Sequence, residues 1–178
     1  MNASVPSDAT GGWIHPRARR RWFWIVLAIG SAMIGVSVAY ARLHYRIGFS
    51  PEEEQSVGSA WSLVTLAPDA VSVGHYAAFH TDARVRLFPT GTLFVKWIAG
   101  GPGDVVRVGA LRTTVNGVVV AGPLDSAARL HIPVRLLERT FILGPGQYFA
   151  VGTRPHSYDS RYWGPVYSGQ FIGPARLL

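Results

Sequence analysis

The sequence contains no cysteine and only one lysine, Lys96, among its 178 residues. The lack of cysteine excludes disulfide bridges, zinc sites with cysteine ligands and catalysis by a thiol. The six histidines are scattered, with no HxH or HxxxH pair, so we expect no metal site, and no cofactor is expected either. Because arginine keeps its proton up to a pKa above about 12, Lys96 is the one side-chain amine that can become a neutral base.

Acidic residues are also few, with ten of them against 17 lysines and arginines, which gives a net charge of +7. Five arginines against Asp8 give residues 1–42 a net charge of +4. Residues 43–178, with eleven arginines, Lys96 and nine acids, are only mildly basic at +3. The basic run Arg17–Arg21 abuts a long uncharged segment, which argues against a nucleic-acid-binding surface, and no nucleic-acid partner is expected.

No charged residue occurs from Trp22 to Ala41. A helix of this length spans roughly 30 Å, the thickness of a bilayer core, and the aromatic residues near both ends are typical membrane-surface anchors. The positive-inside rule places the arginine run in the cytoplasm. We therefore predict a basic cytoplasmic tail over residues 1–21, a transmembrane helix over 22–41 and an exported domain over 45–178, on the periplasmic side of a bacterial inner membrane.

A cleavable signal peptide is the alternative, because Ala39-Tyr40-Ala41 matches the A-x-A pattern of a cleavage site. Signal peptides have apolar cores of about 7–15 residues, and the apolar segment here is longer. An uncleaved anchor is therefore favoured, and both alternatives export the rest of the chain.

From residue 45 onward, short apolar runs alternate with turn residues, a pattern typical of antiparallel strands. Asn116-Gly117 between two valines is a two-residue hairpin signal. Leu130–Arg139 is the best helix candidate, but Pro133 disfavours it. The expected fold class is mostly β, a small antiparallel barrel or folded sheet preceded by one transmembrane helix. The predicted strands are Trp61–Leu66, His75–His80, Thr92–Ile98, Val105–Val108, Thr113–Val120, Thr140–Leu143 and Tyr148–Gly152.

Lys96 lies inside one of these apolar runs and is followed by the turn signal Gly100–Gly103. Burial disfavours the charged form of a lysine and lowers its pKa, which a catalytic base requires. For this stretch alone, the simpler interpretation is a half-buried strand whose lysine extends to solvent.

A second unusual stretch, residues 153–166, is too polar for a core strand and too aromatic for a linker. Asp159 and Arg161 flank Ser160 and can form a charge-assisted contact that fixes the loop. On residue chemistry alone, a polar surface loop and a functional loop are equally good interpretations. A Ser-His-Asp triad built on the neighbouring His156 is disfavoured, and the acidic run Glu52–Glu54 is interpreted as a solvated charge run.

These two stretches resemble the sequence boxes of bacterial type I signal peptidases, and the resemblance covers roughly residues 45–178. Residues 94–104, Phe-Val-Lys-Trp-Ile-Ala-Gly-Gly-Pro-Gly-Asp, are similar to the K-R-V-x-G-L-P-G-D box that supplies the catalytic lysine of that family. Residues 152–166, Gly-Thr-Arg-Pro-His-Ser-Tyr-Asp-Ser-Arg-Tyr-Trp-Gly-Pro-Val, are similar to its G-D-N-x-x-x-S-x-D-S-R-x-x-G-x-V box. The sequence of the second box most resembles that of the conjugative-transfer branch, the TraF-type peptidases that mature pilin precursors.

The resemblance implies a serine–lysine dyad, in which a neutral lysine amine takes the proton of a serine hydroxyl that then attacks the scissile carbonyl. Lys96 would be the general base and Ser157 would orient its amine, while Asp159, Ser160 and Arg161 would be structural residues beside the site. A model lysine titrates near about 10.4, so the site has to lower that pKa by a few units.

The family places its nucleophile shortly after the membrane segment, in an S-M-P or related motif. Ser56 aligns best with it, although Gly58 replaces the proline, and the Ser56 backbone N–H would be one oxyanion donor. Ser50, Ser59 and Ser62 are the alternative nucleophiles.

We therefore expect a membrane-anchored serine endopeptidase that cleaves an exported precursor, such as a pilin subunit of a conjugation or type IV secretion system. The expected partners are that precursor protein, the lipid bilayer and components of the conjugation machinery. Two alternatives stay open. One is a catalytically inactive assembly component of a secretion apparatus, which Gly58 favours, and the other is a general signal peptidase with many substrates.

Overall fold

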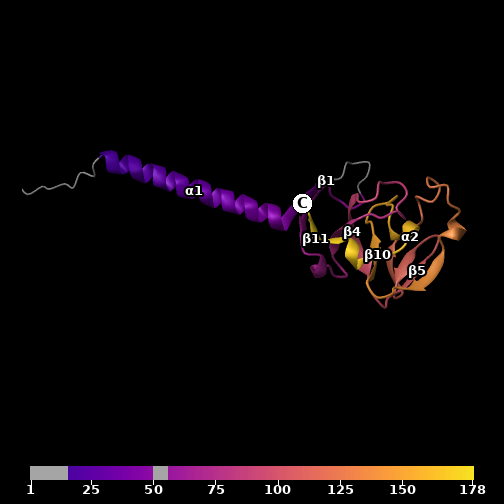
Figure 1. Ribbon diagram of the computed structural model, residues 1–178. Coiled ribbons are helices and arrows are strands. Elements are labelled where there is room, and N and C mark those ends of the chain that lie inside the picture. Colours follow the sequence, from indigo (N-terminus) through magenta and orange to yellow (C-terminus); the bar gives the residue numbers. More distant parts are fainter. Residues whose placement is uncertain (1–15, 50–55) are drawn as a thin grey trace, which may run out of the picture. The chain divides into compact units, whose positions relative to one another are not determined.

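The computed structural model describes residues 16–49 and 56–178. Two of the sequence features, Ser50 and the acidic run Glu52–Glu54, lie outside the described residues. The chain divides into two compact units, residues 1–41 and residues 42–178 (Figure 1).

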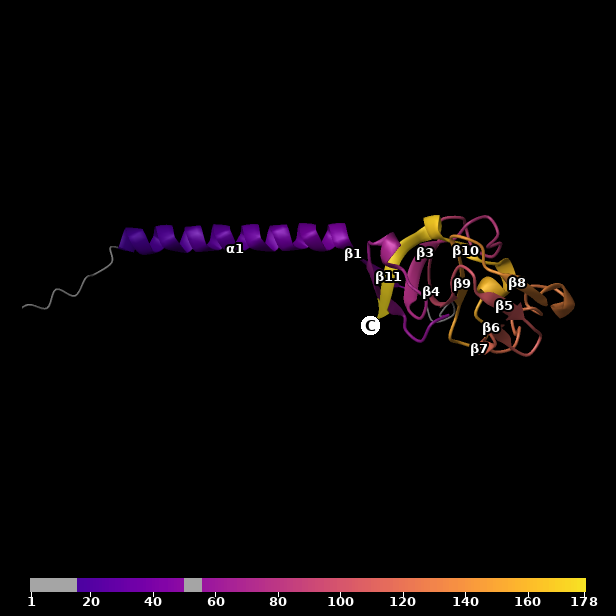
Figure 2. The same ribbon diagram turned by 90° about the horizontal axis from the view of Figure 1, so that it is seen from below.

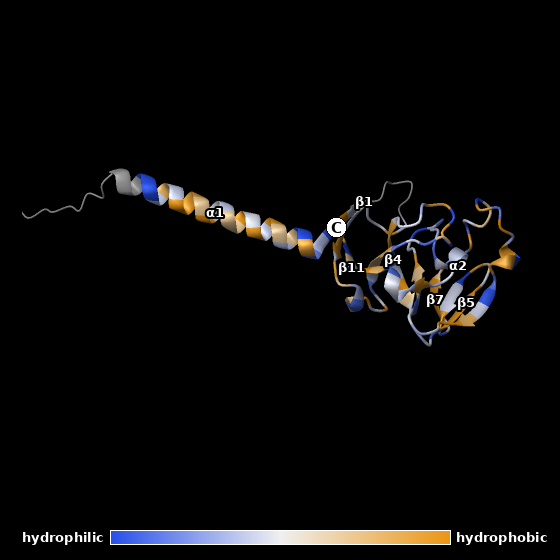
Figure 3. Ribbon diagram, in the orientation of Figure 1, coloured by the Kyte–Doolittle hydropathy of each residue, from blue (hydrophilic) through white to orange (hydrophobic). Residues whose placement is uncertain are grey.

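The first unit is dominated by one long helix, α1 (Pro16–His44). From Arg20 onward nearly all its side chains are exposed, and Figure 3 shows apolar residues along its middle and polar residues toward its ends. Among the described residues, α1 is the one helix long and apolar enough to cross a membrane, over Arg20–His44. A signal sequence near an N-terminus can also be long and apolar enough to meet this criterion, and Ala39-Tyr40-Ala41 lies within the helix.

The described part of the second unit contains eleven strands in two antiparallel sheets, which confirms the mostly β fold class. The larger sheet has the strand order β1-β2-β11-β3-β4-β9-β10 and the smaller one the order β7-β6-β5-β8. Figure 2 shows the smaller sheet at one end of this unit, beyond β4 and β9. The strands are β1 (Tyr45–Phe49), β2 (Trp61–Thr65), β3 (Tyr76–His80), β4 (Leu93–Gly100), β5 (Val105–Val108), β6 (Thr113–Val115), β7 (Val118–Ala121), β8 (Arg139–Ile142), β9 (Gln147–Val151), β10 (Val166–Tyr167) and β11 (Phe171–Leu177). The short helix is α2 (Ser160–Trp163), and the 3-10 turns are η2 (Pro68–Ala70), η3 (Val134–Leu136) and η4 (Ser168–Gln170).

Strand β4 pairs with a different neighbour along each half, and the two pairings overlap only at Trp97. It pairs with β3 from Leu93 to Trp97, whereas its pairing with β9 begins only at Trp97, opposite Val151. No strand among the described residues pairs with the other edge of Leu93–Lys96. The first half of β4 therefore offers backbone N–H and C=O groups to an additional strand.

The C-terminal strand β11 lies between β2 and β3 and joins the two halves of the larger sheet (Figures 1 and 2). Gly173 permits this pairing, because its φ is 153° and a Cβ atom at this position would overlap the Thr65 carbonyl oxygen. A residue with a side chain would push β11 away from the end of β2.

The core is centred on aromatic rings that come from several strands. Phe79 of β3 is fully buried, and its ring centroid lies 6.2 Å from those of Phe94 and Phe171 and 6.1 Å from that of Trp163. Such edge-to-face and tilted contacts add to the hydrophobic gain from burying each ring. The cluster ties β4, β11 and α2 to one another around β3.

Two sequence expectations for this unit changed in detail. The run Thr113–Val120 is two strands, β6 and β7, joined by the expected hairpin, in which Asn116 and Gly117 have φ of 49° and 83°. Positive φ at both central residues is what a type I′ turn requires. Leu130–Arg139 is not a helix. It contains the short turn η3, which begins directly after Pro133, and the first residue of β8, because proline cannot donate the backbone hydrogen bond of a helix interior.

Candidate active site

The site is built around the amine of Lys96 on β4. Only 2% of this residue is exposed, and its Nζ donates a hydrogen bond to Ser157 Oγ at 3.1 Å. The alternative in which the side chain extends to bulk solvent is therefore wrong. The alternation of β4 places Lys96 on its buried side together with Ile98, and there its amine meets Ser157 of the loop that follows β9.

Burial lowers the pKa of Lys96 from its usual 10.5 to about 8. The nearby Asp159 carboxylate raises this pKa and the Arg161 guanidinium lowers it, so the two charges act against each other. A base with a pKa of 8 is neutral in about one molecule in ten at pH 7. The site can therefore supply a free amine near neutral pH, which a solvated lysine cannot do.

Ser157 is buried beside the lysine, with 3% of its surface exposed. Its packing depends on Gly152 at the end of β9. A Cβ atom at Gly152 would overlap the Ser157 side chain and would lie 2.7 Å from the carbonyl oxygen of Ser56. The absence of a side chain at Gly152 therefore lets Ser157 and the Ser56 backbone approach each other at Lys96.

A buried ion pair holds the loop that carries Ser157. Arg161 Nε lies 2.8 Å from Asp159 Oδ1, and Arg161 Nη2 lies 2.8 Å from Asp159 Oδ2, so the contact is bidentate. The Asp159 side chain is fully buried and that of Arg161 is 4% exposed. Asp159 also accepts from the Gly152 N–H at 2.9 Å, and Arg161 donates to the Pro123 carbonyl at 2.9 Å. Charge-assisted, bidentate pairs of this kind fix geometry in both partners.

Two further contacts attach this loop to its surroundings. Ser160 is buried, and its Oγ accepts a hydrogen bond from the Ala150 N–H of β9 at 3.0 Å. Arg161 Nη2 lies 3.3 Å from the Ser157 carbonyl oxygen, to which it donates. The three polar residues 159–161 therefore connect the loop to β9, to the segment at Pro123 and back to Ser157.

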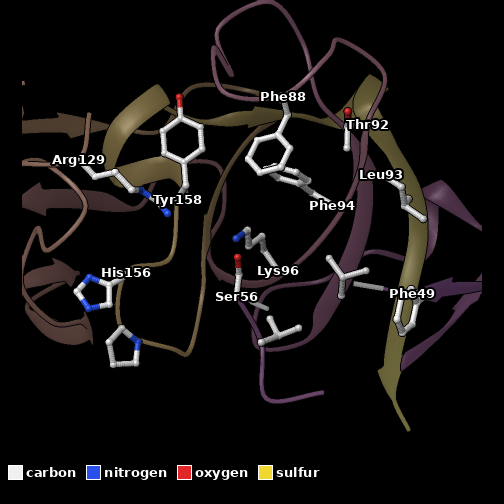
Figure 4. Close-up of a pocket in the computed structure, with 13 residues that line it drawn as sticks. Phe49, Ser56, Phe88, Thr92, Leu93, Phe94, Lys96, Arg129, His156 and Tyr158 are labelled. Carbon is white, nitrogen blue, oxygen red and sulfur yellow. The ribbon is translucent and has the colours of Figure 1, made fainter. Parts of the chain in front are cut away.

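Ser56 also faces the lysine. Its carbonyl oxygen accepts hydrogen bonds from the N–H groups of Thr153, at 2.8 Å, and Arg154, at 3.2 Å. Figure 4 shows the hydroxyl oxygen of Ser56 and the amine of Lys96 pointing toward one another. The next residue, Val57, is 4% exposed and anchors the segment in the protein. The loop after β9 thus holds both Ser56 and Ser157 against Lys96.

The other serines considered from the sequence are placed elsewhere. Ser59 Oγ lies 2.7 Å from the carbonyl oxygen of Leu178 and 2.9 Å from that of Trp61, and it accepts from the Trp61 N–H at 3.1 Å. Ser62 is buried in β2, next to Gly48. Among the serines that the structure describes, Ser56 is the one that lines the cavity in front of Lys96.

That cavity has a volume of about 350 Å³. Figure 4 shows Phe49 and Leu93 on one side of Lys96 and Ser56, and Arg129 and His156 on the other. The ring of His156 lies on the wall and is not directed at Ser56. The lining residues are Phe49, Ser56, Val57, Phe88, Thr92, Leu93, Phe94, Val95, Lys96, Arg129, Pro155, His156 and Tyr158.

Three positions at the site were not found from the sequence. Gly152 lies in the quoted box, but its steric role follows only from how closely Ser56 and Ser157 approach it. Phe88 and Arg129 lie in connections without a motif, and they reach the cavity through tertiary packing. No periodicity or spacing in the sequence could have identified them.

Within residues 16–49 and 56–178, no group of three or more His, Cys, Asp or Glu side chains is placed to hold a metal ion. The buried amine, the two hydroxyl groups and the open cavity are suited to acyl transfer, in which a hydroxyl attacks a carbonyl carbon and the amine carries the proton.

Comparison with known protein families also indicates a peptidase. The model of the family described as signal peptidase, peptidase S26, matches residues 19–178. A crystal structure of a signal peptidase I from Enterococcus faecalis is 24% identical, with a TM-score of 0.40, over 60% of this chain and 97% of the other. A search of curated proteins gave no match. Because the family model spans nearly the whole chain, the protein belongs to the peptidase S26 family of signal peptidases and is a serine endopeptidase.

Proposed function

We propose that the protein is anchored in the bacterial inner membrane and cleaves an exported precursor protein with Ser56 as nucleophile and Lys96 as general base. The observation that carries the proposal is the buried Lys96 amine, which donates to Ser157 at 3.1 Å and faces the Ser56 hydroxyl across the cavity. Ser157 acts as the positioning residue that orients this amine.

The reaction follows from this geometry. The neutral Lys96 amine takes the proton of Ser56 Oγ as this oxygen bonds to the scissile carbonyl carbon. The resulting oxyanion accepts a hydrogen bond from the Ser56 backbone N–H. The Lys96 ammonium then gives its proton to the leaving amine as the peptide bond breaks, which leaves an ester on Ser56. Lys96 next takes a proton from a water molecule that attacks the ester, and returns it to Ser56 Oγ.

The open edge of β4 accounts for substrate binding. One backbone edge of Leu93–Lys96 pairs with no strand among the described residues, and Thr92–Lys96 also lines the cavity. An extended substrate segment adds to such an edge through main-chain hydrogen bonds, and side-chain pockets supply selectivity. The scissile bond is then held beside Ser56, and small residues next to it are the family expectation.

The proposed organisation has three parts. Residues 1–21 form a basic cytoplasmic tail, residues 22–41 span the inner membrane without being removed, and residues 45–178 form the periplasmic catalytic domain. The charge of residues 17–21 and the apolar exposure of α1 support this orientation. The substrate and the catalytic domain then lie on the same side of the bilayer.

The proposed substrate is a pilin subunit or another precursor of a conjugation or type IV secretion system, and components of that machinery are the proposed partners. Support comes from residues 156–166, whose sequence resembles that of the conjugative-transfer branch. Incubation of the purified protein with a pilin precursor and, separately, with a general secretory precursor tests this step. Efficient cleavage of the pilin precursor alone agrees with the proposal, whereas equal cleavage of both indicates a general signal peptidase.

The dyad is tested with two variants of the full-length protein. Ser56→Ala and Lys96→Ala should each abolish processing of the precursor, while the variant still accumulates in the membrane fraction. Ser59→Ala is the matched control, because Ser59 Oγ contacts Leu178 and Trp61 outside the cavity. Normal processing by Lys96→Ala would contradict the dyad, and normal processing by Ser56→Ala would assign the nucleophile to another serine.

One observation favours the alternative of an inactive assembly component. Gly58 stands where the family motif has proline, so the loop that carries Ser56 lacks a rigid residue. In that case Lys96→Ala would support assembly of the secretion apparatus as well as the wild-type protein does. A loss of assembly that parallels the loss of processing would favour the peptidase.

A further inference from the structure

We propose that Arg129 determines substrate specificity by binding a carboxylate in the segment that cleavage releases. This inference rests on the proposed peptidase function and goes beyond it by naming a chemical feature of the substrate. It concerns the wall of the cavity opposite Phe49 and Leu93.

The charges around the cavity are all of one sign in the part that the structure describes. Lys96 and Arg129 line it, and no Asp or Glu from residues 16–49 or 56–178 does so. Lys96 is buried and hydrogen-bonded to Ser157, whereas Arg129 is exposed. No hydrogen bond or ion pair joins Arg129 to another described residue. Its guanidinium, with donors arranged to suit a carboxylate, is therefore available to a molecule in the cavity.

The backbone around Arg129 is attached to the catalytic loop. The Ser126 N–H donates to the Tyr162 hydroxyl oxygen at 3.0 Å, and Ser126 Oγ donates to the His156 carbonyl oxygen at 2.7 Å. Leu130, on the other side of Arg129, donates its N–H to the Ser126 carbonyl oxygen at 3.0 Å. This turn is therefore held against the loop that carries Ser157, and the base of the Arg129 side chain has a fixed place relative to Lys96.

The layout of the cavity decides which part of the substrate meets Arg129. The half formed by Phe49, Leu93 and the neighbouring residues of β4 is apolar, and the open edge of β4 lies there, so we assign the segment before the scissile bond to this half. Arg129 stands on the other side of Ser56 and Lys96 (Figure 4). The segment after the scissile bond therefore passes Arg129. Its carboxylate is either an Asp or Glu side chain or the terminal carboxyl group of a short released segment.

The test measures binding separately from cleavage, with full-length protein in detergent carrying Ser56→Ala. The probes are fluorescent peptides with an apolar segment, Ala-Ser-Ala and four further residues, amidated at the C-terminus. Glu, Gln or Lys occupies each of these four positions in turn. A Gln peptide with a free C-terminus distinguishes a terminal carboxylate from a side-chain carboxylate.

At one of the four positions, we expect the Glu peptide to bind about tenfold more tightly than the Lys peptide. If the bound group is the terminal carboxylate, the peptide with the free terminus should bind about tenfold more tightly than the Lys peptide. Adding Arg129→Glu should reverse that order, because the charge on the cavity wall changes sign. The preference should also weaken as the salt concentration rises. Arg135→Glu is the matched control, since Arg135 lies on η3 in the same connection, is exposed and does not line the cavity. It should leave the order unchanged.

An unchanged order in Arg129→Glu, or the same reversal in Arg135→Glu, would overturn the inference. So would a loss of binding to anionic vesicles in Arg129→Glu without any change in peptide order, because Arg129 would then contact lipid. Cleavage of the same peptides by protein with Ser56 intact tests the peptidase function separately. Cleavage without reversal contradicts the role of Arg129 alone, whereas reversal without cleavage contradicts the peptidase function alone.

Discussion

The environment of Lys96 favours the neutral form of its amine, as the proposed general base requires. Enclosure by β4 and the loop after β9 removes water from its amine, and this desolvation lowers its pKa to about 8. The neighbouring Asp159 and Arg161 are bonded to each other through two hydrogen bonds of 2.8 Å, so their opposing effects on the amine offset each other. Burial therefore decides the protonation state of Lys96.

The rate of cleavage should follow the deprotonation of this amine. Because the neutral form is the base, kcat/KM for a precursor peptide should rise about tenfold per pH unit below pH 8 and level off above it. The pKa of Lys96 is lowered in the folded protein, so the plateau should begin well below the usual titration range of lysine near pH 10.5. Initial rates between pH 5.5 and 9.5 measure this profile. A profile that is flat across pH 8 would contradict Lys96 as the base.

Local motifs made several site residues predictable from the sequence. Lys96, Ser157, Asp159 and Arg161 each lie in a short segment that resembles a signal peptidase box, and this resemblance gave them their expected roles, which the residue types alone did not. Arg129 was not predictable, because its connection between β7 and β8 reaches the cavity only through contacts such as that of Ser126 with Tyr162.

The element that organises the site is the loop between β9 and α2. Its start at Gly152 has to pass between Ser56 and Ser157, its middle carries Ser157, and its end at Asp159 accepts hydrogen bonds from Gly152 and Arg161. One short segment therefore sets the spacing of both hydroxyl groups that face Lys96. Small shifts in this loop should affect catalysis more than folding.

Replacing Gly152 by alanine tests the role of this loop. The added methyl group would overlap the Ser157 side chain and crowd the Ser56 carbonyl oxygen, so both residues have to move away from Lys96. A displacement of about 1 Å in a catalytic site costs on the order of 100-fold in rate, and we expect kcat/KM to fall by about that factor. Gly169→Ala is the control, because nothing lies within 4 Å of the added atom. Equal rates for the two variants would refute this role of the loop.

The sequence indicated most strands but not how they are joined. Alternating apolar runs and turn residues predicted the strands β2 to β9 closely, and Asn116-Gly117 predicted the β6–β7 turn. Strand β11 could not be predicted, because Gly173-Pro174 is a turn signal and the segment is a strand only through its pairing with β2 and β3. Strand β1 was not predicted either, because it directly follows α1 and is a strand through its pairing with β2.

At the scale of the whole molecule, one chain combines an apolar helix with a mostly β peptidase unit. A membrane-anchored enzyme and a precursor that still carries an apolar leader meet within the same bilayer. Their encounter is then governed by a raised effective concentration, as for tethered binding partners. Retention of the helix would therefore increase the rate of processing.

Retention of the helix can be measured on protein isolated from membranes. The apolar segment is longer than the core of a typical cleavable signal, so the mature chain should still contain residues 22–41. N-terminal sequencing and intact mass spectrometry determine this. A mature chain that begins at Arg42 would show that the segment is a signal peptide removed after Ala41.

The most direct test of the Ser56–Lys96 dyad is to trap the covalent intermediate. Wild-type protein is mixed with a precursor peptide, quenched in acid within milliseconds to seconds, digested and analysed by mass spectrometry. We predict that the acyl part of the precursor is found as an ester on Ser56, and that neither Ser56→Ala nor Lys96→Ala forms this adduct. An adduct on any other residue, or the same yield from Lys96→Ala as from the wild type, would contradict the dyad.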